Sequence, residues 1–110
     1  MEEITFYVQG SAPEPYRVTF IRNGGNLSAY CTCRAGENGM YCKHRFQIME
    51  GLTDDIVSDN TTEVQTVSSW LPGTDVGTIY ADVVAIEREI GLLKRRLAKL
   101  KKDLAQAMRD

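Results

Sequence analysis

The sequence lacks several features that define large classes of protein. Its 110 residues contain no apolar run near 18 residues long, so we expect no membrane-spanning helix. The amino terminus shows no charged segment followed by an apolar one, which is the pattern of a secretory leader. A net charge of -2 provides no basic excess of the kind that non-specific nucleic-acid binders carry. These absences favour a cytoplasmic globular protein.

Cysteine and histidine are also scarce. There are three cysteines, so a framework of disulfides alone leaves one thiol unpaired, whereas a reduced compartment suits metal binding. There is one histidine, so no second imidazole is present to act as a general base. We therefore expect neither an enzyme nor a binding protein for a small-molecule substrate.

All three cysteines and the histidine lie within 14 residues, as Cys31-x-Cys33, eight residues, and Cys42-x-His44. Three thiolates and one imidazole form a complete tetrahedral donor set for Zn²⁺. A catalytic zinc keeps one position open for water, so a closed set of four indicates one structural ion. Two alternatives are less favoured: buried apolar cysteines beside a core histidine, and a disulfide such as one between Cys31 and Cys42.

The residues before the cluster predict a small antiparallel sheet. β-branched and aromatic residues predict strands at 4–8 and 16–21. The sequence Asn-Gly-Gly-Asn at 23–26 predicts a tight turn into a returning strand at 27–33. Because Cys31 and Cys33 are two residues apart on that strand, both sulfurs are expected on the same side.

The residues after Cys33 predict a knuckle and a short helix. Gly36 and Gly39 allow the chain to bend back over the ion. A helical pattern begins at Cys42, with His44 in the first turn, and Gly51 is expected to end it. Strands followed by a helix make this an α+β fold.

The spacing Cys-x-Cys, eight residues, Cys-x-His resembles the SWIM-type zinc finger, whose motif is Cys-x-Cys, a variable gap and Cys-x-His. The resemblance covers about residues 4–52, and Cys42-Lys43-His44 matches the Cys-Lys-His form that is common in the family. It implies that the three cysteines and His44 are the zinc ligands. It also implies binding to proteins or DNA, because SWIM modules are linked to chromatin remodelling, transposition, recombination and ubiquitin signalling.

Zinc is expected to fold residues 1–52, which are too few to bury an adequate core. An apparent metal-binding free energy on the order of 10 kcal/mol is then mostly expressed as folding energy. Three cations, Arg34, Lys43 and Arg45, lie beside the ligands and form a candidate face for a partner or for nucleic acid. The favoured alternative is that they neutralise a three-thiolate zinc centre, which is formally -1.

Residues 53–78 hold five acids and no base, and they read as an acidic linker. Asn60 and Glu63 have the spacing of a capping box, which predicts a short helix after them. Pro72 and Gly73 are expected to end that helix.

Residues 79–110 contain the longest periodic segment, a heptad repeat of about four heptads. It predicts one long amphipathic helix. Its apolar seam consists of Val83, Ile86, Ile90, Leu93, Leu97, Leu100 and Leu104, with Ile79 and Ala107 at its ends.

The charges beside the seam rank the ways in which this helix could pair. A parallel dimer places like charges together in two of its three interhelical pairs. An antiparallel dimer sets Glu87 against Lys94 of the second copy and Glu89 against Arg96 of the second copy. We therefore favour an antiparallel homodimer. The alternatives are a helix folded back on residues 61–71 and the finger, and a different partner helix.

The helix also carries a basic run, formed by Lys94, Arg95, Arg96, Lys99, Lys101 and Lys102. These residues spread around the exposed side of the heptads, which favours a solvated coiled-coil surface over a contact with DNA. The favoured function is a non-enzymatic module that binds a protein partner and oligomerises through its C-terminal helix. The alternative is a DNA-binding factor that uses Arg34, Lys43 and Arg45 together with the basic run.

Overall fold

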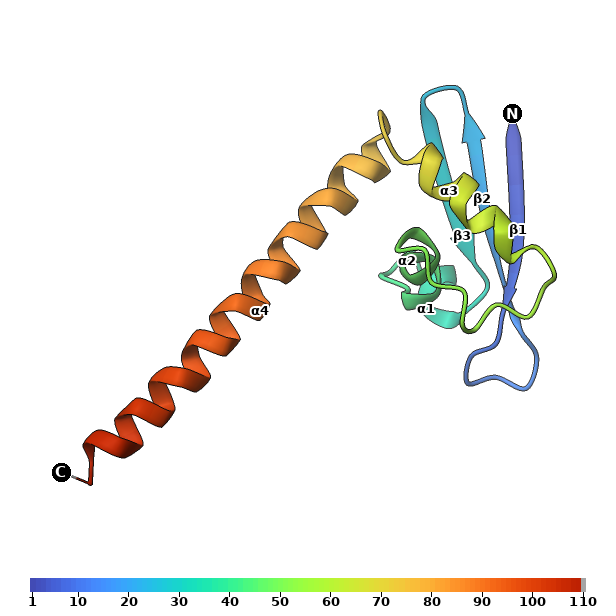
Figure 1. Cartoon of the computed structure of the whole chain (residues 1–110). Coiled ribbons are helices and arrows are strands. Elements are labelled where there is room, and N and C mark those ends of the chain that lie inside the picture. Colours follow the sequence, from blue (N-terminus) through green and yellow to red (C-terminus); the bar gives the residue numbers. More distant parts are fainter. Residues whose placement is uncertain (110) are drawn as a thin grey trace. The chain divides into compact units, whose positions relative to one another are not determined.

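The computed structural model describes residues 1–109 and divides into two compact units, Met1–Thr78 and a second unit that begins at Ile79. It confirms the α+β class, with a three-stranded antiparallel sheet, short helices and one long C-terminal helix (Figure 1). The two units are described separately below.

The sheet has the strand order β1-β2-β3, built from β1 (Glu2–Val8), β2 (Tyr16–Asn23) and β3 (Asn26–Cys31). All three predicted strands are present. Asn23 pairs with Asn26 across the turn, and Gly24 has a φ of 63° there. A left-handed backbone of this kind favours glycine, which explains why the turn forms at the Gly-Gly pair.

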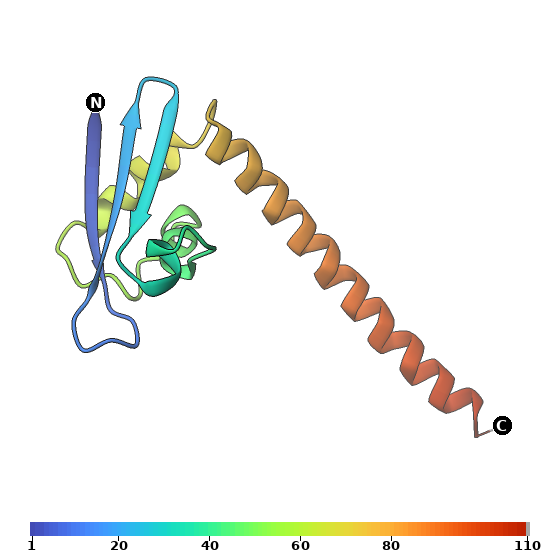
Figure 2. The same ribbon diagram turned by 180° about the vertical axis from the view of Figure 1, so that it is seen from behind.

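One face of the sheet forms the core of the first unit. Because side chains alternate along a strand, Phe6, Val18 and Phe20 all point to this face, and each is fully buried. Helices α2 (Lys43–Met49) and α3 (Val64–Trp70) contribute further buried side chains, which are Ile48, Met49, Val64, Val67 and Trp70. Figure 2, seen from behind, shows the strands in front of α3. Burying one such large side chain stabilises the fold by about 1.5–3 kcal/mol.

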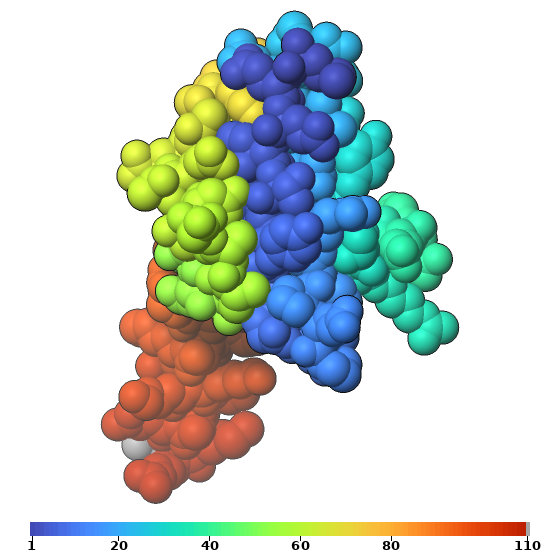
Figure 3. Space-filling view, turned by 90° about the vertical axis from the view of Figure 1, so that its right-hand side faces the viewer, coloured from blue at the N-terminus to red at the C-terminus, as the bar shows by residue number. Residues whose placement is uncertain are grey.

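The segment after α2 packs against β1 and is therefore not the linker that its composition suggested. The backbone N–H of Gln9 donates to the carbonyl of Asp55 at 2.8 Å, and that of Val57 donates to Tyr7 at 2.8 Å. Val8 and Ile56 form an antiparallel bridge between them. Figure 3 shows this segment alongside β1. The first unit consequently extends to Thr78 and includes residues 53–78, which differs from the expected boundary at residue 52.

The start of α3 also differs from the prediction. A 3-10 turn at Thr61–Glu63 precedes the helix, and Asn60 makes no side-chain capping bond. Its amide instead donates to the carbonyl of Thr5 at 2.8 Å and to the carboxylate of Glu63 at 3.1 Å. The predicted capping box is wrong, because the side chain of Asn60 is used to hold this segment to β1.

Helix α4 (Asp75–Ala107) has 33 residues and begins four residues before the predicted start. Thr74 caps it, since its hydroxyl accepts from the N–H of Gly77 at 3.0 Å. At 1.5 Å per residue the helix is about 50 Å long. The seam side chains are mostly exposed; Ile86, Leu93 and Leu100, for example, are 53%, 61% and 55% exposed. Among residues 1–109, no helix is long and apolar enough to cross a membrane.

Candidate metal centre

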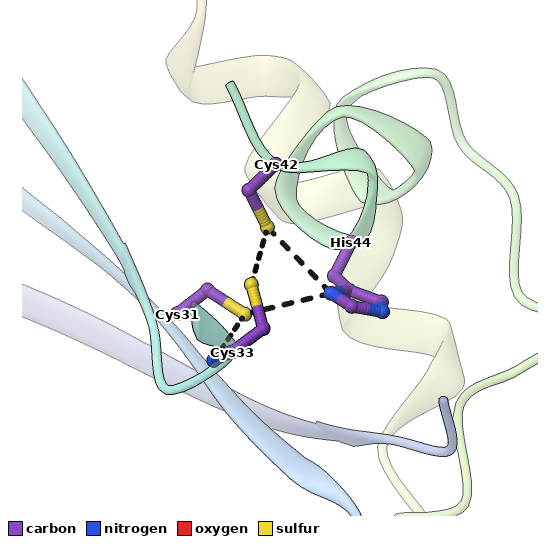
Figure 4. A group of neighbouring side chains, drawn as sticks. All are labelled: Cys31, Cys33, Cys42 and His44. Atoms are coloured by element: carbon purple, nitrogen blue, oxygen red, sulfur yellow. Dashed lines mark hydrogen bonds between the residues drawn. The ribbon is translucent and has the colours of Figure 1, made fainter. Parts of the chain in front are cut away.

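Four potential metal ligands come together where β3 meets α2. The ligand atoms of Cys31, Cys33, Cys42 and His44 all lie within 4.8 Å of one another, and all four residues are buried. Figure 4 shows the three sulfurs and the imidazole pointing toward a common centre. The structure thus brings together the four residues that the spacing predicted.

Two of the ligands come from the end of the sheet. Cys31 is the last residue of β3, and Cys33 caps a short helix, α1 (Arg34–Glu37), with its sulfur accepting from the N–H of Gly36 at 3.3 Å. Cys33 therefore lies beyond the strand, which differs from the expected strand through residue 33. The chain leaves β3 after Cys31 and turns at Cys33 into α1, and the N–H of Cys33 donates to the sulfur of Cys31 at 3.5 Å, which keeps the two residues together.

The other two ligands come from the start of α2, as predicted. Cys42 is the N-cap residue, and His44 lies in the first turn. Cys42 has an extended backbone just before the helix, and Figure 4 shows its side chain and that of His44 directed toward the sulfurs of Cys31 and Cys33. Two short, separately anchored segments thus present one pair of ligands each.

Gly36 is required by close packing rather than by its backbone angle. A Cβ atom at this position would lie 2.5 Å from the carbonyl oxygen of Cys31 and 2.8 Å from its Cβ atom. Gly39, in contrast, has a φ of 70°, which favours glycine directly. Both glycines serve the bend that the sequence predicted, but for different physical reasons.

The distances between the ligand atoms fit a zinc ion. A tetrahedron with Zn–S bonds of about 2.3 Å and a Zn–N bond of about 2.0 Å has edges of about 3.5–3.8 Å. The Sγ atoms of Cys33 and Cys42 are 3.4 Å apart, and Nδ1 of His44 lies 3.7 Å from Cys31 Sγ and 3.6 Å from Cys42 Sγ. These three distances are close to the tetrahedral edges, and all four ligand atoms lie within 4.8 Å of one another, so the cluster is compact enough to hold one Zn²⁺ ion.

Comparison with protein families supports the same conclusion. Residues 16–45 match the family model of the SWIM zinc finger, and the matched range includes all four ligands. The chain contains a SWIM zinc finger. No curated protein and no solved structure gave a significant match. In this SWIM finger, four residues are positioned to hold one zinc ion.

The SWIM finger contains no disulfide. All three cysteines are free thiols, and the 3.4 Å between the sulfurs of Cys33 and Cys42 is far longer than the S–S bond of about 2.05 Å. Cys31 and Cys42 are both free, so the alternative of a bridge between them is not found in this structure.

The environment of the thiols explains why a cation is needed. Burial raises the pKa of the Cys31 thiol to about 12. Burial acts in the same direction on Cys42, but hydrogen bonds from the backbone of Arg45 and from the thiols of Cys33 and Cys31 outweigh it, so the pKa of Cys42 is lowered. Zinc supplies the positive charge that allows three neighbouring thiolates to form together.

His44 is oriented with Nδ1 toward the sulfurs and Nε2 away from them. This orientation presents Nδ1 to a zinc ion held by the sulfurs, and the neutral ring would then carry its proton on Nε2. Burial lowers the pKa of His44, the charge of Lys43 lowers it further, and Asp55 opposes both. A lowered pKa favours the neutral imidazole, which is the form that binds zinc.

The three cations beside the SWIM finger occupy different environments. Arg34 and Lys43 are exposed. Arg45 is half-buried, and its guanidinium donates to the carbonyl of Ala29 at 3.1 Å and to that of Met40 at 2.6 Å. Arg45 thus connects α2 to β3 and to the loop before Cys42. Arg34 and Lys43 remain accessible to a partner.

Sequence reasoning missed the residues that surround His44. The ring of Tyr16 lies against the imidazole, with centroids 4.9 Å apart, and Gly10 approaches Nε2 from the loop between β1 and β2. Asp55 lies in the segment that pairs with β1. No sequence motif connects these residues to the ligands, because their proximity depends on the path of the whole chain.

Proposed function

We propose that this protein is a non-enzymatic interaction module that a zinc ion holds in shape. The observation that carries the proposal is the complete set of four buried ligands, all from one chain. A catalytic zinc needs an open position for water or substrate, and four protein ligands of this type fill the tetrahedron. The zinc then stabilises a surface for binding, and cytoplasmic reducing conditions would keep its thiols available.

We propose further that α4 pairs with α4 of a second copy in antiparallel orientation. A single helix cannot bury a stripe of Ile and Leu side chains along its own length, and a heptad repeat suits a facing helix. Antiparallel pairing sets Glu87 near Lys94 of the second copy and Glu89 near Arg96 of the second copy. Sedimentation analysis of the zinc-loaded chain tests this proposal: a dimer is expected, and a monomer at high micromolar concentration would refute it.

A protein is the favoured partner of the SWIM finger. The unit Met1–Thr78 contains ten acidic and five basic residues, so it is acidic as a whole. An acidic surface repels nucleic acid and suits a partner with exposed basic groups. Affinity capture with the zinc-loaded chain, compared with a C42S/H44A variant that has lost two ligands, tests whether partner binding depends on the folded finger.

DNA binding is the second candidate, and a specific observation favours it. Arg34 and Lys43 are exposed beside the zinc ligands, and the basic run of α4 carries six further cations. A gel shift with duplex and single-stranded DNA across a salt series separates the two candidates. Binding with a steep loss of affinity as salt rises supports DNA, and no binding at low salt rejects it.

A further inference from the structure

The Nε2 atom of His44 is a buried donor whose partner is not explained by the zinc site. His44 is 7% exposed, and Nε2 has no hydrogen-bond partner among residues 1–109. Nδ1 faces the sulfurs, so a neutral ring that binds zinc through Nδ1 would carry its proton on Nε2. A buried N–H without an acceptor costs about 1–3 kcal/mol, and zinc-binding histidines almost always donate this proton to an acceptor.

The surroundings of the imidazole indicate where the acceptor lies. Gly10 and the ring of Tyr16 close one side: a Cβ atom at Gly10 would lie only 3.1 Å from Nε2. His44 also lines a cavity of about 40 Å³. Its polar lining comes from His44, Gln47, Asp54 and Asp55, and its apolar lining from Val8, Ile48, Leu52 and Ile56. A cavity of this size and polarity can hold an ordered water molecule.

Asp55 is the acidic residue of this cavity that is best anchored beside His44. The backbone carbonyl of Asp55 accepts from the N–H of Gln9 at 2.8 Å, and Gln9 is the residue directly before Gly10. Ile56, which follows Asp55, forms the bridge with Val8. The charge of Asp55 also acts on the imidazole of His44. Asp54 lines the same cavity, but its backbone makes no such bond to β1 among residues 1–109.

We propose that Asp55 is a positioning residue for the zinc site, whose carboxylate accepts the Nε2 proton of His44 through a water molecule in this cavity. The hydrogen bond holds the proton on Nε2, leaves the Nδ1 lone pair free for zinc, and fixes the ring orientation. The segment after the finger thus becomes part of the metal site. This inference rests on zinc binding and is independent of partner binding or dimerisation.

The first test uses the unaltered zinc-loaded chain. Because the protein has a single histidine, its imidazole ¹⁵N and ¹H resonances can be assigned without ambiguity. We expect zinc on Nδ1 and a proton on Nε2 that exchanges slowly with bulk water and shows magnetisation transfer from a bound water. Zinc on Nε2, or an Nε2 proton that exchanges as rapidly as an exposed imidazole, overturns the proposal.

The second test measures zinc affinity by competition with a chromophoric chelator. We expect D55A to weaken zinc binding about 10–100-fold, the usual effect of losing such a partner, and D55N to weaken it less because its amide oxygen can still accept. D59A is the control for the loss of one exposed negative charge in the same loop, and D54A is the control for the cavity itself. Both are expected to stay within about threefold of the unaltered chain.

The outcomes distinguish Asp55 from Asp54 as the residue that accepts the Nε2 proton. A large loss in D55A with partial recovery in D55N, together with faster exchange of the Nε2 proton in D55A, supports the proposal. A loss in D54A without one in D55A, or equal effects in all variants, overturns it. If D55A fails to fold, the exchange and water contacts of the Nε2 proton in the unaltered chain still decide the question. Failure to dimerise or to bind a partner leaves this result unaffected.

Discussion

The guanidinium of Arg45 donates a hydrogen bond to the carbonyl oxygen of Ala29 at 3.1 Å and so ties the helix that carries two zinc ligands to the strand that carries another. Its second bond reaches the carbonyl of Met40 at 2.6 Å. Hydrogen bonds that involve a charged group contribute about 1.5–3 kcal/mol, and solvent exposure of the Met40 bond places this pair toward the low end. Arg45 therefore stabilises the finger by connecting α2 to β3 and to the loop before Cys42.

We expect R45M to lower the free energy of unfolding of the zinc-loaded finger by about 1–2 kcal/mol, since the part-buried carbonyl of Ala29 and the exposed carbonyl of Met40 both lose their donor. K43M removes a neighbouring exposed cation and is the matched control, with an expected change within about 0.5 kcal/mol. Urea unfolding followed by circular dichroism measures both. Equal effects of the two substitutions would show that Arg45 acts only through its charge.

Removal of zinc should unfold the first unit, because its core is small and three thiols and an imidazole are left clustered without the ion. A strong chelator is expected to release one zinc per chain and to abolish the dispersed amide signals of residues 1–78. Zinc content by mass spectrometry and a proton–nitrogen correlation spectrum measure this. An apo form that keeps its dispersed spectrum would contradict the structural role of the ion.

Acidification should release the zinc. Burial lowers the pKa of His44 in the folded chain, so the unfolded chain binds the imidazole proton more readily. The neutral imidazole of His44 contributes its full stability above the pKa of an unfolded histidine, about 6.5. This contribution is lost as the pH falls through the lower pKa that His44 has in the folded chain. Protons also compete with zinc for the three thiolates. We expect full occupancy at about pH 7 and little at about pH 4, measured with a zinc indicator; full retention at about pH 3 would argue against this ligand set.

Replacing Gly36 should destabilise the finger by steric conflict. We expect G36A to lower the free energy of unfolding by about 1–3 kcal/mol, because the added Cβ meets the backbone of Cys31. G25A is the control, since a Cβ at Gly25 meets nothing within 4 Å and its φ is not positive. Thermal unfolding of the two zinc-loaded variants measures the difference. A G36A variant as stable as G25A would mean that the turn into α1 relaxes easily.

Charge exchange along α4 should reveal the direction of pairing. In an antiparallel dimer Glu89 faces Arg96 of the second copy, so E89K places like charges together twice per dimer and weakens dimerisation about 5–30-fold. The double variant E89K/R96E restores the attraction. In a parallel dimer, E89K/K94E restores it instead. Sedimentation equilibrium on the three variants distinguishes the orientations, and no effect of E89K would exclude both.

The zinc ligands could be read from the sequence because they lie within 14 residues and need only local turns to converge. The hairpin and the start of α2 follow from the same kind of local information, namely alternating side chains, a Gly-Gly turn and a helical period. The turn of Cys33 out of β3 was not predicted, because a cap formed by a cysteine sulfur has no strong sequence signal. It changes how the sulfurs converge without changing which residues bind.

Residues 53–78 show where local patterns fail. Their acidic composition is typical of a linker, yet Val64, Val67 and Trp70 are buried in the core. The amide of Asn60, which local spacing assigns to a helix cap, finds its partner at Thr5, 55 residues away. A long-range hydrogen bond of this kind depends on chain segments that meet only after folding.

The sequence by itself determined the metal, its four ligands and the heptad period of the long helix, because each depends on residue types at short, regular spacing. Tertiary structure decided that the first unit extends to Thr78, that Arg45 connects α2 to β3, and that Nδ1 of His44 faces the three sulfurs while Nε2 faces away from them. The physical reason is that burial and hydrogen bonding among distant segments depend on how the sheet is covered. The segment after the finger is part of that covering, because it pairs with β1 and continues into α3.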